Sequence, residues 1–351
     1  MTDRMPIRER IPLNTLAIPF GTAGLAEVWT AVADALDWSR AVVAVAWGAA
    51  AVVWAAMIVA HVRRGIVTGL PLAAQLRHPV QGPIAVLALV VPVLLSAAAL
   101  RVWPDPARGA VAVTVVATLL FSAWFIGRLI AGGVPADAVH GGYFLPTVAA
   151  GYICAYGLAQ AGWRGIAIGC VAFATLAWVA TLAVVVARLA VRPPLPDVLV
   201  PTLAIIVAPP AVGGLAWFAV TDGRIDDLQW ALAGVFAVMV AVQVALVPLY
   251  RRTAFTLGFW SFTFPYAAAV TYAIVWLSAA AEAPGAAGAA SAVLAVVLAA
   301  AITLFVVAIA VRSLASLGTA PGGVGAEAIV AREDDEPART GGVGAPGGES
   351  R

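Results

Sequence analysis

Ten separate apolar runs, each long enough to cross a bilayer, dominate the sequence. A transmembrane helix needs about 20 consecutive, mostly apolar residues, and charged residues, prolines or glycines bound each run. The runs cover residues 13–33, 41–61, 79–100, 109–130, 143–162, 165–187, 197–220, 228–249, 260–280 and 289–313. The sequence therefore predicts an all-α integral membrane protein, with a ten-helix transmembrane domain over residues 13–313.

The composition supports a membrane protein. Hydrophobic residues make up 63% of the chain and charged residues 11%, and the mean hydropathy is +0.98, far from the balance of an ordinary soluble domain. The 20 cationic residues are all Arg, and the net charge of +2 is too small to indicate a nucleic-acid partner. Cys154 and Cys170 fall within apolar runs, so we interpret them as small hydrophobic residues rather than as a disulfide or metal ligands.

The segments outside the ten runs are short or polar. Residues 1–12 are predicted to form a short cytoplasmic segment. The first run ends in "AVA" at 31–33, which resembles a signal-peptide cleavage site, but the run contains Pro19 and Glu27 and exceeds the about 7–15 apolar residues of a signal peptide. The tail over residues 316–351 is rich in Gly, Pro and charge and is predicted to be disordered. No phosphate-binding glycine loop occurs, so a fused ATPase or kinase is not expected.

The arginines predict the orientation. Cytoplasmic segments of membrane proteins carry an excess of Lys and Arg. With the amino terminus inside, the fifteen inner arginines are Arg4, Arg8, Arg10, Arg63, Arg64, Arg77, Arg128, Arg188, Arg192, Arg251, Arg252, Arg312, Arg332, Arg339 and Arg351. The five outer arginines are Arg40, Arg101, Arg108, Arg164 and Arg224. We therefore expect a multi-pass protein of the cell membrane with both termini in the cytoplasm.

Prolines interrupt every odd-numbered run and leave the even-numbered runs intact, apart from one proline at a run's end. The interrupting prolines are Pro19, Pro92, Pro146, Pro209 with Pro210, and Pro265, and the terminal one is Pro248. A proline within a helix removes a backbone donor, and irregular backbone at membrane depth is tolerated only inside protein or beside a water-filled cavity. The alternation predicts five helical hairpins, with kinked odd helices around a central pore and straight even helices outside. The general abundance of proline in membrane helices is the alternative explanation.

The stretch "GFWSFTFPYAAAV" at 258–270 contains the candidate pore gate. Phe262 and Phe264 lie about 200° apart around a helix, so only one of them can face the axis of a pore. Phe264 directly precedes Pro265 and shares its face with the small Ala268. A bulky ring at a narrow point can close a pore. The alternative is an aromatic side chain that serves packing alone.

Ionisable residues are almost absent from the interiors of the spans. Glu27 is the only carboxylate well within one, while Arg128, Asp197 and Arg312 lie near helix ends. An intramembrane enzyme would need several such groups at one depth, so the sequence argues against an enzyme. Glu27 is interpreted as an outer-mouth carboxylate, as the proton-binding residue of a carrier, or as a residue tolerated near the interface.

No metal or other cofactor is predicted. The three histidines, His61, His78 and His140, all fall at cytoplasmic helix ends. No carboxylate or thiol stands beside them at the spacing of a metal site. We interpret them as interfacial residues rather than as ligands or bases.

Three segments resemble the tellurite-resistance/dicarboxylate transporter family. They are "IPFGTAGLA" (18–26), "GYFLPTVAAG" (142–151) and "WSFTFPYAAAVTYA" (260–273), and the resemblance covers about residues 11–314. That family includes bacterial TehA, the plant guard-cell slow anion channels, and fungal malate carriers and sulfite exporters. The resemblance implies a homotrimer in which each protomer has its own pore, formed by the five odd-numbered helices.

The same resemblance implies that a phenylalanine on the ninth helix occludes each pore. Phe264 is the best match in "SFTFP", and Phe262 is the second choice. Glu27 departs from the small or apolar residue expected in its segment, and the long regulatory amino-terminal region of the plant channels is missing from this sequence. Candidate pore-lining residues beside the breaks are Phe20, Gly21, Phe144, Gly213 and Ala268.

Three function classes follow. The first is an anion channel that passes small anions such as chloride or nitrate through a pore gated by Phe264. The second is a secondary carrier or exporter of a C4-dicarboxylate, sulfite or a tellurium oxyanion, for which Glu27 is the only candidate coupling carboxylate. The third is a membrane protein without a pore, which predicts no flux at all.

Overall fold

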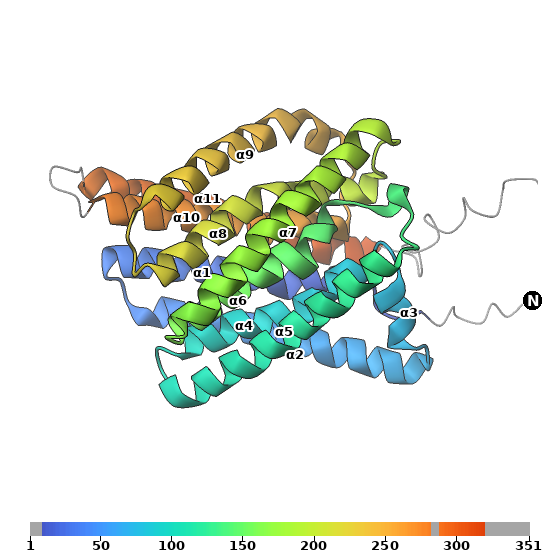
Figure 1. The fold of residues 1–351 in the computed structure, drawn as a ribbon, viewed down its shortest axis with the longest axis horizontal. Helices are drawn as coiled ribbons and strands as arrows, with labels where there is room; N and C mark the ends of the chain where they lie inside the picture. The colour runs from blue at the N-terminus through green and yellow to red at the C-terminus, as the bar shows by residue number, and fades with distance from the viewer. Residues whose placement is uncertain (1–8, 282–287, 320–351) are drawn as a thin grey trace, which may run out of the picture. The chain divides into compact units, whose positions relative to one another are not determined.

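The computed structural model describes residues 9–281 and 288–319, and every regular element in these ranges is a helix (Figure 1). This confirms the predicted all-α class. Within the described ranges, nine helices are long and apolar enough to cross a membrane. The predicted fifth span is also helical, from Gly141 to Gln160, but it changes helix type along its length. Residues 1–8 of the predicted terminal segment 1–12 lie outside the described residues. The same holds for residues 320–351 of the predicted tail 316–351.

Each odd-numbered span begins as a 3₁₀ helix and continues as an α-helix. The pairs are η1 (Leu13–Leu16) with α1 (Ala17–Leu36), η2 (Gly82–Val86) with α4 (Leu87–Ala99), η4 and η5 (Gly141–Phe144 and Leu145–Ala149) with α6 (Ala150–Gln160), η6 (Asp197–Val207) with α8 (Ala208–Val220), and η7 (Leu257–Phe262) with α10 (Thr263–Ala281). The short segments are 3₁₀ helices, except for η5, which is a π-helix. Such segments within a span commonly mark strain or a functional position.

The interrupting prolines explain where the helix type changes. Pro19 and Pro265 are the third residues of α1 and α10, and Pro209 is the second residue of α8. A proline is best tolerated in the first turn of an α-helix. Pro146 lies within η5, and Pro92 alone lies in the middle of an α-helix, α4. Most of the expected mid-span breaks are therefore changes of helix type.

The even-numbered spans are continuous α-helices in the described part of the chain. They are α2 (Arg40–Thr68), α5 (Pro104–Ala131), α7 (Arg164–Val191), α9 (Asp227–Arg252) and α11 (Gly288–Thr319). Each extends beyond its predicted apolar run, because arginines such as Arg63 and Arg64 stop an apolar run but are good helix formers. The connections contain the short α3 (Leu72–Arg77) and η3 (Ala136–Ala138).

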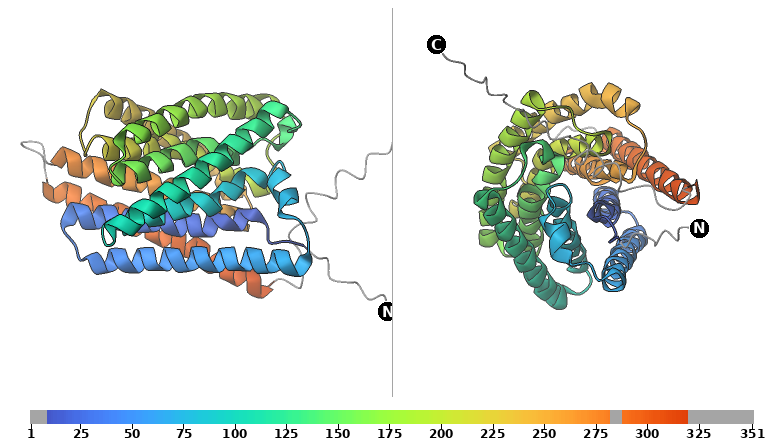
Figure 2. Two further views of the ribbon diagram at one scale, coloured as in Figure 1. Left: turned by 60° about the horizontal axis from the view of Figure 1, so that its bottom comes forward. Right: turned by 90° about the vertical axis from the view of Figure 1, so that its right-hand side faces the viewer.

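The α-helices of the odd spans contact one another in a closed order. α1 contacts α4, α4 contacts α6, α6 contacts α8, α8 contacts α10, and α10 contacts α1. The right panel of Figure 2 views these helices end-on. α1, α4, α6 and α8 each also contact the continuous helix that follows them. Phe305 of α11 packs against Phe262 and Tyr266 at the start of the ninth span.

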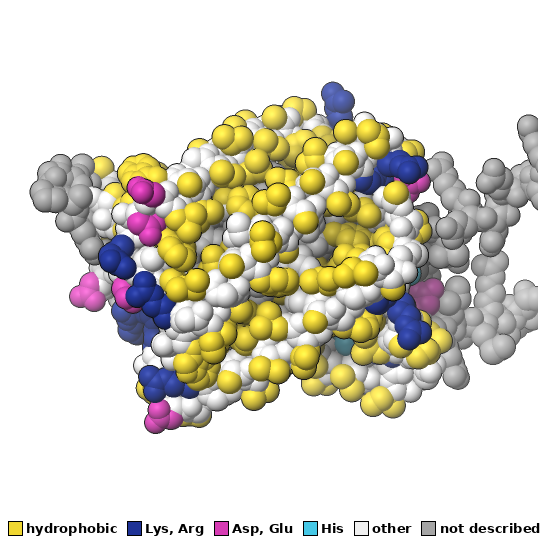
Figure 3. All heavy atoms as spheres, viewed as in Figure 1, with side chains coloured by type: hydrophobic (Ala, Val, Ile, Leu, Met, Phe, Trp, Pro, Cys, Tyr) yellow, Lys and Arg dark blue, Asp and Glu magenta, His cyan; other side chains and the backbone are white. Residues whose placement is uncertain are grey.

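The continuous helices face outward. In the most apolar stretch of the seventh span, 83% of the residues are buried inside the protein. In the corresponding stretches of α9 and α2, only 6% and 17% of the residues are buried. On the face shown in Figure 3, hydrophobic side chains cover the middle and charged side chains gather at the two ends. Large apolar side chains such as Val45, Leu120 and Val244 are exposed on these helices. This pattern is that of helices in contact with lipid.

The structure corrects the interpretation of His140 as an interfacial residue, because its side chain is 0% exposed. Nδ1 of the ring accepts a hydrogen bond from the backbone N–H of Gly142 at 3.0 Å, and Nε2 lies 3.1 Å from the carbonyl oxygen of Val80. Since Nδ1 accepts, the neutral ring carries its proton on Nε2 and donates it to Val80. His140 therefore ties the start of η4 to the connection before η2. His78 plays a similar local part, because its Nδ1 accepts from the N–H groups of Val80 and Gln81.

The burial of His140 predicts that the protein loses stability in mild acid. Burial lowers the pKa of this imidazole from 6.5 to about 4. The unfolded chain therefore takes up this proton first as the pH falls, so the stabilisation is complete above about pH 6.5 and is lost toward pH 4. We expect a loss of about 2 kcal/mol at about pH 5 from this group. Thermal unfolding in detergent measures it.

The His140→Gln variant is the control for this prediction. Its amide can keep one of the two hydrogen bonds but does not titrate in this range. The variant should therefore lose less stability than the wild type between about pH 7 and about pH 5. An equal loss in both proteins would assign the acid sensitivity to other groups.

Candidate functional site

A cavity of about 310 Å³ lies among the α-helices of the odd spans. Every one of these helices contributes to its wall, through residues that include Glu27 of α1, Leu94 of α4, Tyr156 of α6, Phe218 of α8 and Ala268 of α10. In α1, α4, α6 and α8 the lining residues come mostly from the carboxyl-terminal half, whereas those of α10 begin at its second residue, Phe264. The cavity therefore lies toward the end of the protein at which α1 ends.

Phe264 lies at the inner end of this cavity. It is the first residue of α10 that lines the wall. Its ring stacks on the ring of Phe20 from α1, with the centroids 3.5 Å apart and the planes 12° apart. The two side chains are only 5% and 4% exposed. Two aromatic rings from helices far apart in the chain thus lie face to face, and of the two Phe264 lines the cavity while Phe20 does not.

The absence of a side chain at Gly24 leaves space for the ring of Phe264. A Cβ atom at this position would lie 2.9 Å from Cδ2 of Phe264 and 3.1 Å from Cβ of Ala267. Real Cβ atoms almost never make a contact as short as the first of these. The glycine therefore permits the close approach of α1 and α10 beside the stacked rings.

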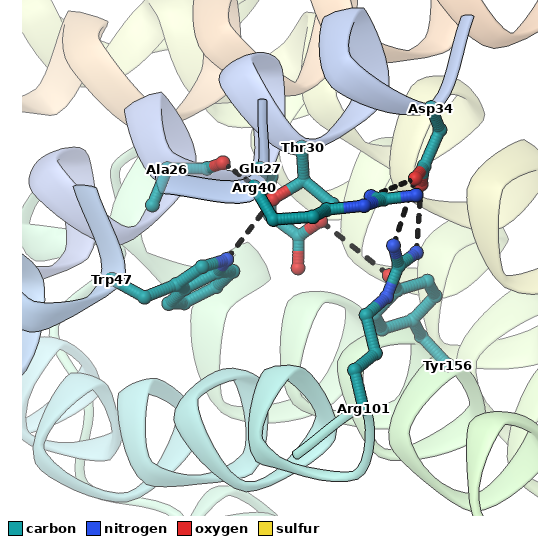
Figure 4. A network of polar contacts seen from close by, with 8 residues as sticks. All are labelled: Ala26, Glu27, Thr30, Asp34, Arg40, Trp47, Arg101 and Tyr156. Atoms are coloured by element: carbon teal, nitrogen blue, oxygen red, sulfur yellow. Dashed lines mark hydrogen bonds and ion pairs between the residues drawn. The ribbon is translucent and has the colours of Figure 1, made fainter. Parts of the chain in front are cut away.

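Three groups of polar contacts involve residues of α1 (Figure 4), and two of them include charged residues that line the cavity. In the first, the hydroxyl of Tyr156 donates to Oε2 of Glu27 at 3.4 Å. In the second, Arg101 donates to both oxygens of Asp34, at 2.8 and 2.7 Å, and Arg40 donates to the same carboxylate. The three elements α1, α6 and the turn after α4 are thereby joined at the mouth of the cavity.

The two carboxylates of α1 in this site, Asp34 and Glu27, differ in their partners. Asp34 forms ion pairs with Arg40 and Arg101, and its hydrogen bonds raise the pKa of the Arg101 guanidinium further above its ordinary value. Within the described chain, the carboxyl group of Glu27 forms no ion pair, and its hydrogen bond is the one from Tyr156. Asp222 also lines the cavity, but its side chain is exposed.

The remaining candidate residues from the sequence are placed as follows. Ala268 lines the cavity with Phe264. Gly21 lies against Thr263 of α10, and Gly213 against the ring of Tyr152 of α6, so both serve contacts between helices. Phe144 is buried in η4. None of these last three lines the cavity above the rings.

Phe262 takes part in a different aromatic cluster. Its ring packs edge-on against Tyr250 of α9 and Phe305 of α11, and it also contacts Phe259 and Tyr266. It does not line the cavity. The two phenylalanines of "SFTFP" therefore have separate surroundings, as expected from their angular separation on a helix.

Sequence reasoning missed Asp34, Arg101 and Tyr156 as members of the site. Asp34 follows Glu27 by seven residues, which is two helical turns, so the spacing placed both carboxylates on one face of the first span. The spacing of Glu27 and Asp34 could therefore have identified Asp34 from the sequence. No sequence signal pointed to Arg101 or Tyr156, which come from separate helices.

Among residues 9–281 and 288–319, no group of three or more His, Cys, Asp and Glu side chains is placed to hold a metal ion. Cys154 and Cys170 are both buried free thiols. This agrees with their interpretation as small hydrophobic residues.

The helices and the cavity define a multi-pass, all-α membrane protein with an internal chamber. Residues 10–314 match the family SLAC1, described as voltage-dependent anion channel, and the chain belongs to this family. Members of this family are channels or transporters rather than enzymes. The chain is also similar to a tellurite resistance protein TehA homolog from Haemophilus influenzae, with 25% identity over 263 residues, which cover 74% of this chain and 80% of the relative. The family predicted from the three sequence segments is confirmed.

Proposed function

We propose that this protein is an anion channel that passes small anions such as chloride or nitrate through a pore within each protomer, with Phe264 as the gate. The observation that carries the proposal is the cavity lined by all five odd-span helices, with the stacked rings of Phe264 and Phe20 at its inner end. An aromatic ring at a narrow point can stop conduction by steric block and dewetting. Membership of the anion channel family supports the same function.

The proposed architecture is five helical hairpins, with the odd helices around the pore and the even helices toward lipid. The closed order of contacts among the odd helices and the exposure of α2 and α9 support it. The excess of arginines on one side supports cytoplasmic termini in the cell membrane. A homotrimer remains part of the proposal through the family resemblance.

A second candidate is a carrier or exporter of a dicarboxylate, sulfite or a tellurium oxyanion. The position of Glu27 in the cavity favours it, because an intramembrane carboxyl group is a common proton-coupling residue. The name of the Haemophilus influenzae relative supports tellurite resistance as one outcome. Under this alternative, transport saturates with substrate and moves protons.

Electrical recording from the purified protein in bilayers tests the two candidates. Reversal potentials in gradients of chloride, nitrate, sulfite and malate rank the permeant anions. A channel gives a current that follows the anion gradient without proton movement. Saturating uptake into proteoliposomes with proton movement would instead favour the carrier, and a properly inserted protein without any anion flux would contradict both.

A further inference from the structure

The position of Glu27 along α1 places it next to the proposed gate. Gly24 lies beside the Phe264 ring, where a Cβ atom would come within 2.9 Å of it, and Glu27 follows Gly24 by three residues, about 4.5 Å farther along the helix axis. Both residues line the cavity. An anion that moves between the mouth of the cavity and the Phe264 ring must therefore pass the carboxyl group of Glu27.

The charged groups that surround Glu27 come from several elements. They are Asp34 on α1, Arg40 at the start of α2, Arg101 after α4 and Asp222 after α8. The polar groups without charge are the hydroxyls of Tyr156 on α6 and Thr271 on α10. Arg40 and Arg101 both form ion pairs with Asp34, so the three groups together carry one net positive charge. Asp222 is exposed, and solvent screens its charge.

The mouth and the interior of the cavity therefore act on an anion in opposite directions. The cluster of Asp34, Arg40 and Arg101 attracts an anion to the mouth. Ionised Glu27 repels it one helical turn before the ring. This carboxyl group has one long hydrogen bond, from Tyr156 at 3.4 Å, and no ion pair among the described residues. An isolated ionised group of this kind is costly inside a membrane protein.

We propose that Glu27 determines the charge selectivity of this cavity, and that a proton on its carboxyl group is what allows anions to pass. The proton comes from water in the cavity and binds a carboxylate oxygen, which removes the negative charge without breaking a covalent bond. The hydroxyl of Tyr156 donates to the carboxylate and can accept from the protonated acid. Anion flux therefore increases when the solution on the cavity side becomes acidic. This inference rests on the proposed channel function and adds its regulation.

The test uses the Phe264→Ala variant as background, so that the ring does not limit the current. Currents and reversal potentials are recorded in a potassium chloride gradient at about pH 8 and about pH 5 on the cavity side. Coulomb repulsion over about 10 Å at an effective dielectric constant near 20 corresponds to roughly a tenfold change in anion occupancy. We therefore expect about tenfold more chloride current in acid. We also expect the reversal potential to move closer to the equilibrium potential of chloride.

Substitutions at Glu27 decide whether this residue is responsible. Glu27→Gln should give the large, chloride-selective current at both pH values, because the amide carries no charge. Glu27→Asp should keep the pH dependence. Asp222→Asn is the matched control, since it removes another carboxylate of the same cavity, one that is exposed to solvent, and it should also keep the pH dependence. Asparagine tolerates the positive φ of 52° at this position.

Two results would overturn the inference. One is an unchanged pH dependence in Glu27→Gln, and the other is loss of transport in that variant, which would favour the coupled carrier. If Phe264→Ala carries no anion current, the proposed channel function itself fails. Infrared difference spectra then report the proton on Glu27 independently: a protonated-carboxyl band that appears on acidification in the wild type and not in Glu27→Gln supports the titration, and its absence contradicts it.

Discussion

Phe264→Ala is expected to increase anion current through each protomer by at least about tenfold. The ring of Phe264 lies at the inner end of the cavity and stacks on Phe20 at 3.5 Å. In the proposed gate, truncation removes the larger part of the obstruction, and a barrier lowered by only about 1.4 kcal/mol already raises a rate tenfold. Planar-bilayer recording of wild type and variant at equal protein density measures the increase.

Phe262→Ala is the matched control for the gate. It removes the same side chain two positions earlier, from the cluster with Tyr250 and Phe305 that lies apart from the cavity. Both variants should lose stability, because Phe→Ala in a packed interior costs about 3–5 kcal/mol. Only Phe264→Ala should raise the current. Equal currents in the two variants would remove Phe264 from the gating role.

Phe20→Ala extends the same test to the partner ring. Phe20 lies on α1, and its ring stacks on the ring of Phe264. If the closed stack is the obstruction, Phe20→Ala also raises the current, and the double variant raises it further. A rise confined to Phe264→Ala would show that one ring alone blocks the path.

Gly214→Ala is expected to lower the stability of the protein by about 3 kcal/mol, through overpacking and a disturbed hydrogen-bond network. A Cβ atom at Gly214 of α8 would overlap the ring of Tyr272 on α10. Tyr272 is completely buried, and its hydroxyl donates to Oε1 of Gln229 at 3.0 Å. Nε2 of Gln229 in turn donates to the carbonyl oxygen of Gly214 at 2.8 Å. The added methyl group therefore disturbs the contact that joins α8, α9 and α10.

Gly234→Ala provides the control for this prediction. Gly234 lies within α9, and a Cβ atom there would meet no other atom within 4 Å. Alanine at such a helical position is favoured over glycine by about 0.5–1 kcal/mol. Thermal unfolding in detergent should therefore show a lower midpoint for Gly214→Ala and an unchanged or higher one for Gly234→Ala. Equal midpoints would contradict the packing at Gly214.

The helical spans could be predicted from the sequence because their signal is local. Apolar runs of about 20 residues are required by the thickness of the bilayer, and nine of the described helices meet this requirement. Proline placement distinguished the spans that begin as tight helices from the continuous ones, since a proline lacks the backbone donor that a continuous helix uses. The sequence did not show that most prolines would fall where the helix type changes, because the short 3₁₀ segments have the same apolar composition as the α-helices after them.

The position of His140 shows a second limit of local reasoning. It stands between spans, where an ionisable side chain is normally exposed, and the prediction of an interfacial residue was wrong. The side chain is buried because Val80 and Gly142 supply partners for both of its ring nitrogens. Val80 lies far away in the chain, so no local pattern could indicate this contact.

The sequence by itself determined the membrane-spanning helices, their two kinds and Phe264 as a candidate gate, because hydrophobicity and the missing N–H of proline act within a few residues. Only the tertiary structure decided that Phe20 faces Phe264, that Tyr156 reaches Glu27 and that Arg101 binds Asp34. Each of these pairs depends on how two helices are rotated and how far one is shifted along the other. Side-chain packing between helices sets both quantities, and it is a property of the whole assembly of spans rather than of any one of them.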